Sequence, residues 1–142
     1  MARRLILDTT ALIAFERGTL DRAALAEDDI AIAAVTVAEF RAGIELADTP
    51  ARAAARQAVF AAIVAAVPVL DYTAATAAAH ARLIAHTRRA GRPRGAHDLL
   101  IAAAAREHGR IVVSSDARAR FDDLPDVDWL ATTSLGHRGP TV

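Results

Sequence analysis

Short apolar runs rich in β-branched residues alternate along the chain with longer stretches of helical periodicity. Runs of the first kind, bounded by turn residues, predict buried strands, and the longer stretches predict helices. The expected strands are Arg4–Leu7, Ile30–Ala33, Val67–Leu70, Ile111–Ser114 and, as a possible fifth, Val127–Leu130. The expected helices are Thr10–Arg17, Thr36–Ala47, Pro50–Ala66, Thr73–Ala90 and His97–His108.

Capping residues mark the ends of several predicted helices. Thr36 stands where an N-cap is expected, and Glu39 three residues later completes a capping-box pattern. Proline is favoured at the first position of a helix, which is where Pro50 falls. Glycines follow three of the predicted helix ends, at Gly18, Gly91 and Gly109.

Strands that are joined by helices predict a parallel sheet with helices on both faces. The sequence therefore predicts an α/β fold of three layers, α/β/α, around a sheet of four to five strands. No internal repeat or linker interrupts the pattern, so we expect one domain over residues 1–142, with a loosely ordered tail from about residue 131. The longest apolar stretch, residues 58–70, contains Pro68 and falls short of the roughly 20 residues of a membrane span, so no membrane association is expected.

Composition excludes several classes of chemistry. The chain has no cysteine, which rules out disulfides and thiolate metal sites. All 17 basic residues are arginine, so phosphate loops and Schiff bases that need a lysine are also ruled out. The net charge is zero, so no positive field of the whole molecule attracts a nucleic acid. The apolar run near the first residue is too short for a signal peptide, which favours a cytoplasmic location.

Four acidic residues fall at one predicted edge of the sheet. Asp8 follows the first strand, and Asp116 follows the fourth. Glu39 and Asp98 lie in the predicted first turns of helices that begin at the same edge. Each acid alone has a second interpretation, because a carboxylate near a helix start caps it or complements its dipole. Caps do not explain why Glu39 and Asp98 recur in otherwise apolar helix starts.

Four carboxylates within a few ångströms repel one another, and a bound cation removes that repulsion. Ligation by oxygen alone suits a hard ion, Mg²⁺ or Mn²⁺. Such ions stabilise charge on a phosphoryl group and activate water for in-line attack. The acidic edge therefore predicts metal-dependent hydrolysis of a phosphodiester.

At these residues the chain resembles the PIN-domain family, and more narrowly the VapC-type toxins of bacterial toxin–antitoxin pairs. The resemblance runs from Leu5 to about Leu130. It rests on four motifs in order: Leu5-Ile6-Leu7-Asp8-Thr9-Thr10, Thr36-Val37-Ala38-Glu39-Phe40, His97-Asp98-Leu99-Leu100-Ile101-Ala102, and Val112-Val113-Ser114-Ser115-Asp116 followed by Phe121. Two departures from the family pattern are Ser114, where Thr or Asn is more common, and the segment 95–97, which lacks a common proline.

The resemblance implies a PIN-like fold and a ribonuclease toxin. It implies that the catalytic and metal-binding acids are Asp8, Glu39, Asp98 and Asp116, with Mg²⁺ or Mn²⁺ as cofactor. The hydroxyls of Thr10 and Ser114 would not bind the metal but would orient the carboxylates or water that do. The implied partners are an RNA substrate (a tRNA or rRNA), a VapB-type antitoxin that inserts a segment into the acidic groove, a second copy in a homodimer, and the toxin–antitoxin hetero-oligomer.

Arginines cluster just before the predicted helix that carries Asp98. Contacts to an RNA backbone would suit this cluster, which consists of Arg88, Arg89, Arg92 and Arg94. A solvated helix end, where cations complement the dipole, is an equal alternative. His97 has a similar pair of interpretations, as a substrate contact or as a surface residue at a helix start.

Two other functions compete with the ribonuclease. An aspartate-nucleophile phosphatase or a phospho-receiver domain also places an acid after the first strand, but Asp8-Thr9-Thr10 has no second acid and the chain has no lysine. A non-catalytic PIN-like module that binds RNA or protein is the stronger alternative. The intact set of four acids argues against it.

Overall fold

The computed structural model describes residues 2–136 and contains a five-stranded parallel sheet. The spatial order of the strands is β3-β2-β1-β4-β5. Their bounds are β1 Arg4–Leu7, β2 Asp29–Ala33, β3 Val69–Leu70, β4 Ile111–Ser114 and β5 Trp129–Ala131. The predicted parallel sheet is confirmed, with the possible fifth strand present.

Helices connect these strands as the periodicity predicted. They are α1 Thr9–Glu16, α2 Ala34–Glu45, α3 Pro50–Ala66, α4 Ala74–Ala90 and α5 Ala96–His108. Short 3₁₀ turns occupy Ala23–Leu25, Ala117–Ala119, Phe121–Asp123 and Thr132–Gly136. Within residues 2–136, no helix combines the length and the hydropathy that crossing a bilayer requires.

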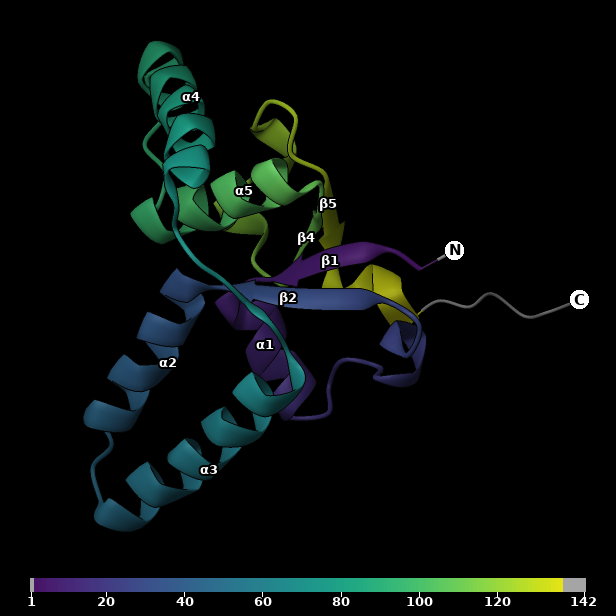
Figure 1. The fold of residues 1–142 in the computed structure, drawn as a ribbon, viewed down its shortest axis with the longest axis vertical. Coiled ribbons are helices and arrows are strands. Elements are labelled where there is room, and N and C mark those ends of the chain that lie inside the picture. The colour runs from purple at the N-terminus through teal and green to yellow at the C-terminus, as the bar shows by residue number, and fades with distance from the viewer. Residues whose placement is uncertain (1, 137–142) are drawn as a thin grey trace, which may run out of the picture.

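The sheet separates two hydrophobic layers, because alternate side chains of each strand point to opposite faces. On one face, Ile6 and Val112 pack against the buried side of α5 and against Leu83 of α4. On the other face, Leu7 and Val113 pack with residues of α1 and α3. Figure 1 shows α4 and α5 above the sheet and α1 and α3 below it. The three-layer α/β/α prediction is therefore confirmed.

The strand order reverses beside β1. The chain passes from β1 to β2 and β3 on one side, and then returns across the sheet to place β4 on the other side of β1. In a parallel sheet, ligands bind outside the carboxyl ends of the strands at such a switch point. The ends of β1 and β4 are the places where Asp8 and Ser114 lie. The topology thus marks this edge as the binding edge.

Helix α2 begins earlier than predicted. Its first residue is Ala34, and its N-cap is the extended Ala33 at the end of β2, with no side-chain cap. Thr36 is fully buried in the first turn, and its hydroxyl has no hydrogen-bond partner. The predicted capping box of Thr36 and Glu39 is therefore wrong. Because the helix starts directly from the strand, Glu39 lies in the second turn rather than the first.

Two strand and tail predictions also need correction. β3 begins at Val69 rather than Val67, because Val67 ends α3 and Pro68 has no N–H for the ladder. The tail predicted as loose from residue 131 is ordered as far as the structure describes it. Ala131 belongs to β5, and Thr132–Gly136 forms a 3₁₀ turn in which Leu135 is buried. The rest of that predicted tail, residues 137–142, lies outside the described residues.

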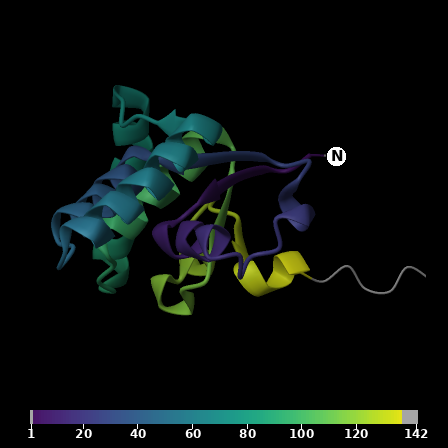
Figure 2. The ribbon, with the colours of Figure 1, turned by 90° about the horizontal axis from the view of Figure 1, so that it is seen from below.

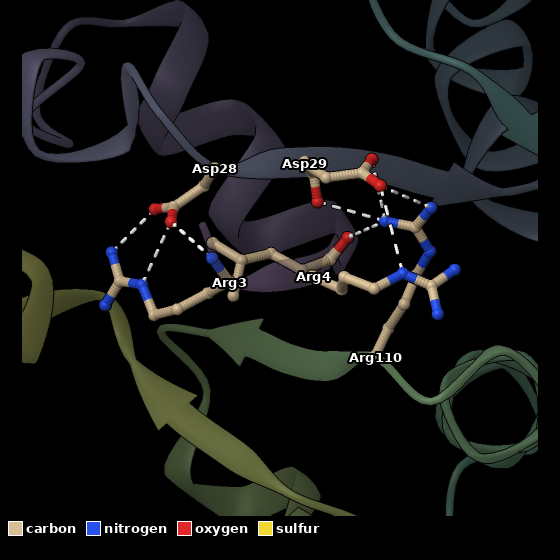
Figure 3. Close-up of polar contacts among 6 residues, drawn as sticks. Arg3, Arg4, Asp28, Asp29 and Arg110 are labelled. Atoms are coloured by element: carbon tan, nitrogen blue, oxygen red, sulfur yellow. Dashed lines mark hydrogen bonds and ion pairs between the residues drawn. The ribbon is translucent and has the colours of Figure 1, made fainter. Parts of the chain in front are cut away.

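The amino edge of the sheet is closed by arginine–aspartate contacts (Figure 3). Arg110, which precedes β4, donates to the carbonyl oxygens of Leu5 and Asp29 at 3.1 and 3.0 Å and also pairs with the Asp29 carboxylate. Arg3 pairs with Asp28 at 2.6 Å. These contacts join the starts of β1, β2 and β4. The two ends of the sheet therefore differ in kind, because acids are paired at the amino edge and gather at the carboxyl edge.

Candidate active site

Asp8 is the anchor of the carboxyl edge. It follows β1 directly, has extended backbone, and caps α1 by accepting a hydrogen bond from the Ala11 N–H at 2.8 Å. Its side chain also accepts from the Thr10 hydroxyl at 2.6 Å and from the Ser114 hydroxyl. The residue is only 3% exposed. Asp8 thus caps a helix, as one sequence interpretation expected, and in doing so it is held in one orientation.

Ser114 and Thr10 extend this network from β1 to β4. Ser114 is fully buried, and its hydroxyl accepts from the Asp116 N–H at 3.0 Å. The Thr10 hydroxyl accepts from the Ser115 N–H at 3.0 Å. These contacts agree with the expectation that the two hydroxyls orient carboxylates. They fix the position of the Asp116 backbone relative to Asp8.

Asp98 belongs to α5, which packs on the face of the sheet opposite to α1. It lies in the first turn of α5, and its carboxylate folds back over Gly95, the N-cap residue. A Cβ at Gly95 would come within 2.8 Å of the Asp98 Oδ2 atom. The missing side chain of Gly95 therefore provides the space that the carboxylate occupies.

The charges of the other acids act on Asp98. Burial raises the pKa of Asp98 above its ordinary value, and the nearby negative charges of Asp8, Asp116 and Glu39 raise it further, while His97 acts in the opposite direction. Each of the three acids comes from a different part of the chain. Asp8, Asp116 and Glu39 therefore lie within electrostatic range of Asp98 at this edge of the sheet.

Glu39 lies on the α2 side of this edge. Its carboxylate is 3.5 Å from the His97 Nδ1 atom, which links α2 to the start of α5. Glu39 and the half-buried Thr9 also line a groove of about 370 Å³ between α1, α2 and α3. The hydroxyl of Thr9 is buried there without a hydrogen-bond partner. The acidic edge is therefore open to a groove that passes between three helices.

The structure does not present a finished metal site. Across residues 2–136, no three His, Cys, Asp or Glu side chains lie close enough to hold a metal ion as they stand. In the same part of the chain, Glu39 lies beside the His97 ring, but Asp8, Asp98 and Asp116 have no arginine or histidine within ion-pair distance. Three acids thus share one edge without a cationic partner, and their donor atoms are all oxygen, the type that a hard divalent ion prefers.

The arginine cluster divides into two kinds of residue. Arg88 and Arg89 are exposed in the last turn of α4, as an RNA contact or a solvated helix end requires. Arg92 is also exposed, and it pairs with Asp123 at 3.2 Å. The Arg94 side chain is 8% exposed and donates to backbone carbonyls and to Asp123. Arg94 is therefore a buried structural contact, which fits neither of the two interpretations that the sequence left open, an exposed RNA contact or a solvated helix end.

Two features of the site were not identified from the sequence. Gly95 stood out only as the first residue of the segment 95–97 that lacks a common proline, and the long-range contacts of Arg94 leave no local signal. The spacing of Gly95 and Asp98 is the one hint that the sequence offered. An N-cap residue faces the side chain of the third helical residue, so a glycine there leaves space for that side chain.

Comparisons with known proteins agree with this architecture. The family model of the PIN domain matches residues 5–127. The tRNA(fMet)-specific endonuclease VapC of Shigella flexneri is 35% identical over 111 residues, which cover 77% of this chain and 82% of that protein. The structure is similar to VapBC-5 of Mycobacterium tuberculosis, with a TM-score of 0.75, 32% identity, and coverage of 90% of this chain and 98% of that one. It is also similar to DNA-bound VapBC of Salmonella typhimurium, with a TM-score of 0.80, 26% identity, and coverage of 93% and 99%.

Proposed function

Because the chain belongs to the PIN-domain family, and within it is similar to the VapC toxins, we propose that it is a divalent-metal-dependent endoribonuclease. The chain is a VapC-like endonuclease toxin by its family and by its 35% identity to a VapC endonuclease. The observation that carries the metal-dependent proposal is the pair Asp8 and Asp116, joined through Ser114 at the switch point of the sheet, whose charges and that of Glu39 raise the pKa of Asp98 beyond the effect of burial.

The acidic edge fits Mg²⁺ or Mn²⁺ by the chemistry of its donors. The four carboxylates supply oxygen ligands. Burial raises the pKa of Asp98, and the charges of Asp8, Asp116 and Glu39 raise it further; a bound cation would oppose the second effect. Asp8, Asp98, Asp116 and Glu39 are the residues that would hold the ion. When bound, the ion supplies positive charge that stabilises a phosphoryl group and lowers the pKa of water.

The chain itself contributes orientation. Asp8 is fixed by the Thr10 and Ser114 hydroxyls and by the Ala11 amide, so one carboxylate is rigid before any ligand arrives. Outer hydrogen bonds of this kind set the direction and basicity of metal-binding groups. Asp98 and Glu39 have fewer contacts and adjust around that fixed group.

RNA is the proposed substrate, and the VapC relative, which is named for tRNA(fMet), favours a tRNA. Exposed Arg88, Arg89 and Arg92 are the candidate backbone contacts. The similar structures are VapBC complexes, so we propose a VapB-type antitoxin as the partner. Its inserted segment would occupy the groove that Thr9 and Glu39 line, and the toxin would act as a homodimer within the hetero-oligomer.

One observation favours the alternative of a non-catalytic PIN-like binding module. The acids of residues 2–136 do not form a ready set of three ligands. A module that had lost its metal would bind RNA or a partner without cutting. The two proposals differ in a single measurable property, which is cleavage that depends on a divalent ion.

The test uses the full chain, purified free of any antitoxin and incubated with total tRNA in Mn²⁺, in Mg²⁺ or in chelator. We expect discrete fragments with either ion and none with chelator. Asp8→Asn and Asp98→Asn should each lower cleavage at least about 100-fold, the scale of losing one charge-stabilising group from an active site. Asp128→Asn, a matched change of an exposed acid just before β5 at the opposite edge, should cut normally. Binding of tRNA without cleavage would support the binding module instead.

A further inference from the structure

Arg94 joins two segments of the site that are distant in sequence. It lies two residues before α5 and four before Asp98. Its guanidinium donates to the carbonyl oxygens of Ala119 at 2.8 Å and of Arg120 at 2.6 Å, and it pairs with the Asp123 carboxylate at 3.0 Å. The acceptors belong to the loop that leaves β4 through Asp116. Arg94 therefore connects the segment that carries Asp98 with the segment that carries Asp116.

The loop that Arg94 contacts has a shape that needs support. It consists of two short 3₁₀ turns, Ala117–Ala119 and Phe121–Asp123, joined at Arg120. Arg120 has a φ of 50°, a left-handed conformation that costs a non-glycine residue energy. The carbonyls on either side of this joint, those of Ala119 and Arg120, are the ones that accept from Arg94. The buried Arg94 guanidinium thus fixes the loop at Arg120, where the backbone is strained.

The start of the same loop is fixed from the other side. Asp116 accepts from the Arg118 N–H at 2.9 Å, and its own N–H donates to Ser114. Phe121 is buried in the layer that also contains residues of α5. The loop is therefore held at its beginning by β4 and at its middle by Arg94. Loss of the second contact would remove the polar link between the Asp98 segment and the middle of the loop, although Ser114 and the buried Phe121 would still hold other parts of the loop.

We propose that Arg94 is a positioning residue, which sets the Asp98 segment against the Asp116 segment through the Ala119 and Arg120 carbonyls. The proposal rests on the proposed metal-dependent function, since it concerns the spacing of two of its acids. Arg94 touches neither carboxylate. Its effect is expected on the affinity for a divalent ion rather than on the chemistry of cleavage.

Arg92 provides a matched control two residues away. It also pairs with Asp123, at 3.2 Å, but its side chain is 64% exposed and its contacts do not include the two carbonyls. Removal of Arg92 takes away the same type of charge from the same partner. A difference between the two variants therefore isolates the contact with the strained joint.

The experiment measures Mn²⁺ affinity of the RNA-free protein from the electron paramagnetic resonance signal of free Mn²⁺, well below each melting temperature. The proteins are the wild type, Arg94→Met, Arg94→Lys and Arg92→Met. We expect Arg94→Met to bind Mn²⁺ about ten-fold more weakly, the low end of the effect of losing a group that bonds a metal ligand directly, because Arg94 acts one contact further away. We expect Arg92→Met to bind Mn²⁺ with the affinity of the wild type, and Arg94→Lys to recover part of the affinity that Arg94→Met loses. Saturating Mn²⁺ should restore tRNA cleavage by Arg94→Met, because all four acids remain.

Wild-type affinity in a folded Arg94→Met overturns the positioning role and leaves the proposed function standing. An equal loss in Arg92→Met also overturns it, because the effect would then belong to Asp123 alone. If Arg94→Met does not fold, Arg94→Gln replaces it under the same criteria, since one amide cannot reach both carbonyls and Asp123. A wild-type protein that binds no Mn²⁺ overturns the proposed function first, and the role of Arg94 with it.

Discussion

Asp8 and Asp98 carry the same charge in opposite surroundings. Asp8 accepts hydrogen bonds from two hydroxyls and a backbone amide, which satisfy its carboxylate within the fold. Asp98 is half-buried, and burial raises its pKa; the charges of three further carboxylates raise it more. The folded protein therefore stabilises the charge of Asp8. It destabilises the charge of Asp98, and a bound cation would offset that loss of stability.

Asp98→Asn should stabilise the metal-free protein at pH 7. The folded state holds the Asp98 proton more tightly than the unfolded chain does, because its pKa is raised in the fold. Ionised Asp98 therefore lowers stability at neutral pH, and this penalty disappears as the pH falls through the raised pKa and below the ordinary value of 3.8. We expect a higher melting temperature for Asp98→Asn in chelator at pH 7, and no difference at pH 3.

Addition of Mn²⁺ should make the melting temperature of the wild type higher than that of Asp98→Asn, the reverse of the order in chelator. A ligand that binds only the folded state stabilises it, so the wild type should gain in melting temperature and Asp98→Asn should gain little. Asp128→Asn, which changes an exposed acid at the opposite edge, should follow the wild type under both conditions. A lower melting temperature for Asp98→Asn in chelator at pH 7 would show that the Asp98 charge is not under strain.

Gly95→Ala should weaken the proposed metal site without unfolding the protein. The new Cβ comes within 2.8 Å of the Asp98 Oδ2 atom, so the carboxylate has to move. At an N-cap, the exchange of glycine for alanine changes stability by only about 1 kcal/mol or less. We expect about a ten-fold loss of Mn²⁺ affinity, the scale seen when groups around a metal ligand are disturbed, measured by titration of the RNA-free protein.

Gly43→Ala is the matched control for this change. A Cβ at Gly43 meets nothing within 4 Å, and the residue lies inside α2. There the added methyl should leave Mn²⁺ affinity unchanged and raise stability by up to about 1 kcal/mol, through helix propensity. Equal Mn²⁺ affinities of the two alanine variants would show that Asp98 does not depend on the space at Gly95.

At the scale of elements, three threonines near helix starts behave differently. Thr49 and Thr73 accept a hydrogen bond from a backbone N–H of the third helical residue and are true N-caps. Thr36 occupies the same kind of sequence position, but it is buried in the first turn of α2 with an unpaired hydroxyl. The difference arises because β2 runs directly into α2, which leaves no loop residue to serve as the cap.

Thr36→Val should therefore leave stability unchanged or raise it, by up to about 1 kcal/mol. The substitution removes a buried hydroxyl that has no partner and keeps the shape of the side chain. A capping box would instead predict a loss of about 1 kcal/mol. Urea unfolding of Thr36→Val beside Thr49→Val decides between the two, since Thr49→Val should lose about 1 kcal/mol as a real cap. A loss in both variants would restore the capping role of Thr36.

The same contrast explains what the sequence could predict. Strand positions followed from short apolar runs such as Leu5-Ile6-Leu7, and helix positions followed from periodicity and from glycines such as Gly91 and Gly109, because these are local signals. The shared edge of Asp8 and Asp98 followed from the topology that those elements imply. The start of α2 and the contacts of Arg94 did not, because both depend on burial and on partners that lie elsewhere in the chain.

At the scale of the molecule, the two edges of the sheet have different roles. Figure 2 shows the N-terminal end of the chain on one side of the molecule and the blue and teal helices on the other. At the carboxyl end, the strands stop at Asp8 and Ser114, beside acids that repel one another. At the amino end, arginines satisfy both carbonyls and carboxylates. The fold thus separates the edge where charge is left unbalanced from the edge that stabilises the sheet.

Arg110→Met tests this separation, because Arg110 and Arg94 are both buried arginines that bind backbone carbonyls. Arg110 holds the starts of β1 and β2 at the amino edge, so its loss leaves the Leu5 and Asp29 carbonyls without those donors. Such a loss should lower the free energy of unfolding by about 2 kcal/mol or more. The Mn²⁺ affinity of the folded protein should remain that of the wild type, because the carboxyl edge is untouched. Urea unfolding and Mn²⁺ titration of the same preparation measure both quantities. A weakened Mn²⁺ affinity in folded Arg110→Met would mean that the two edges are coupled through the strands.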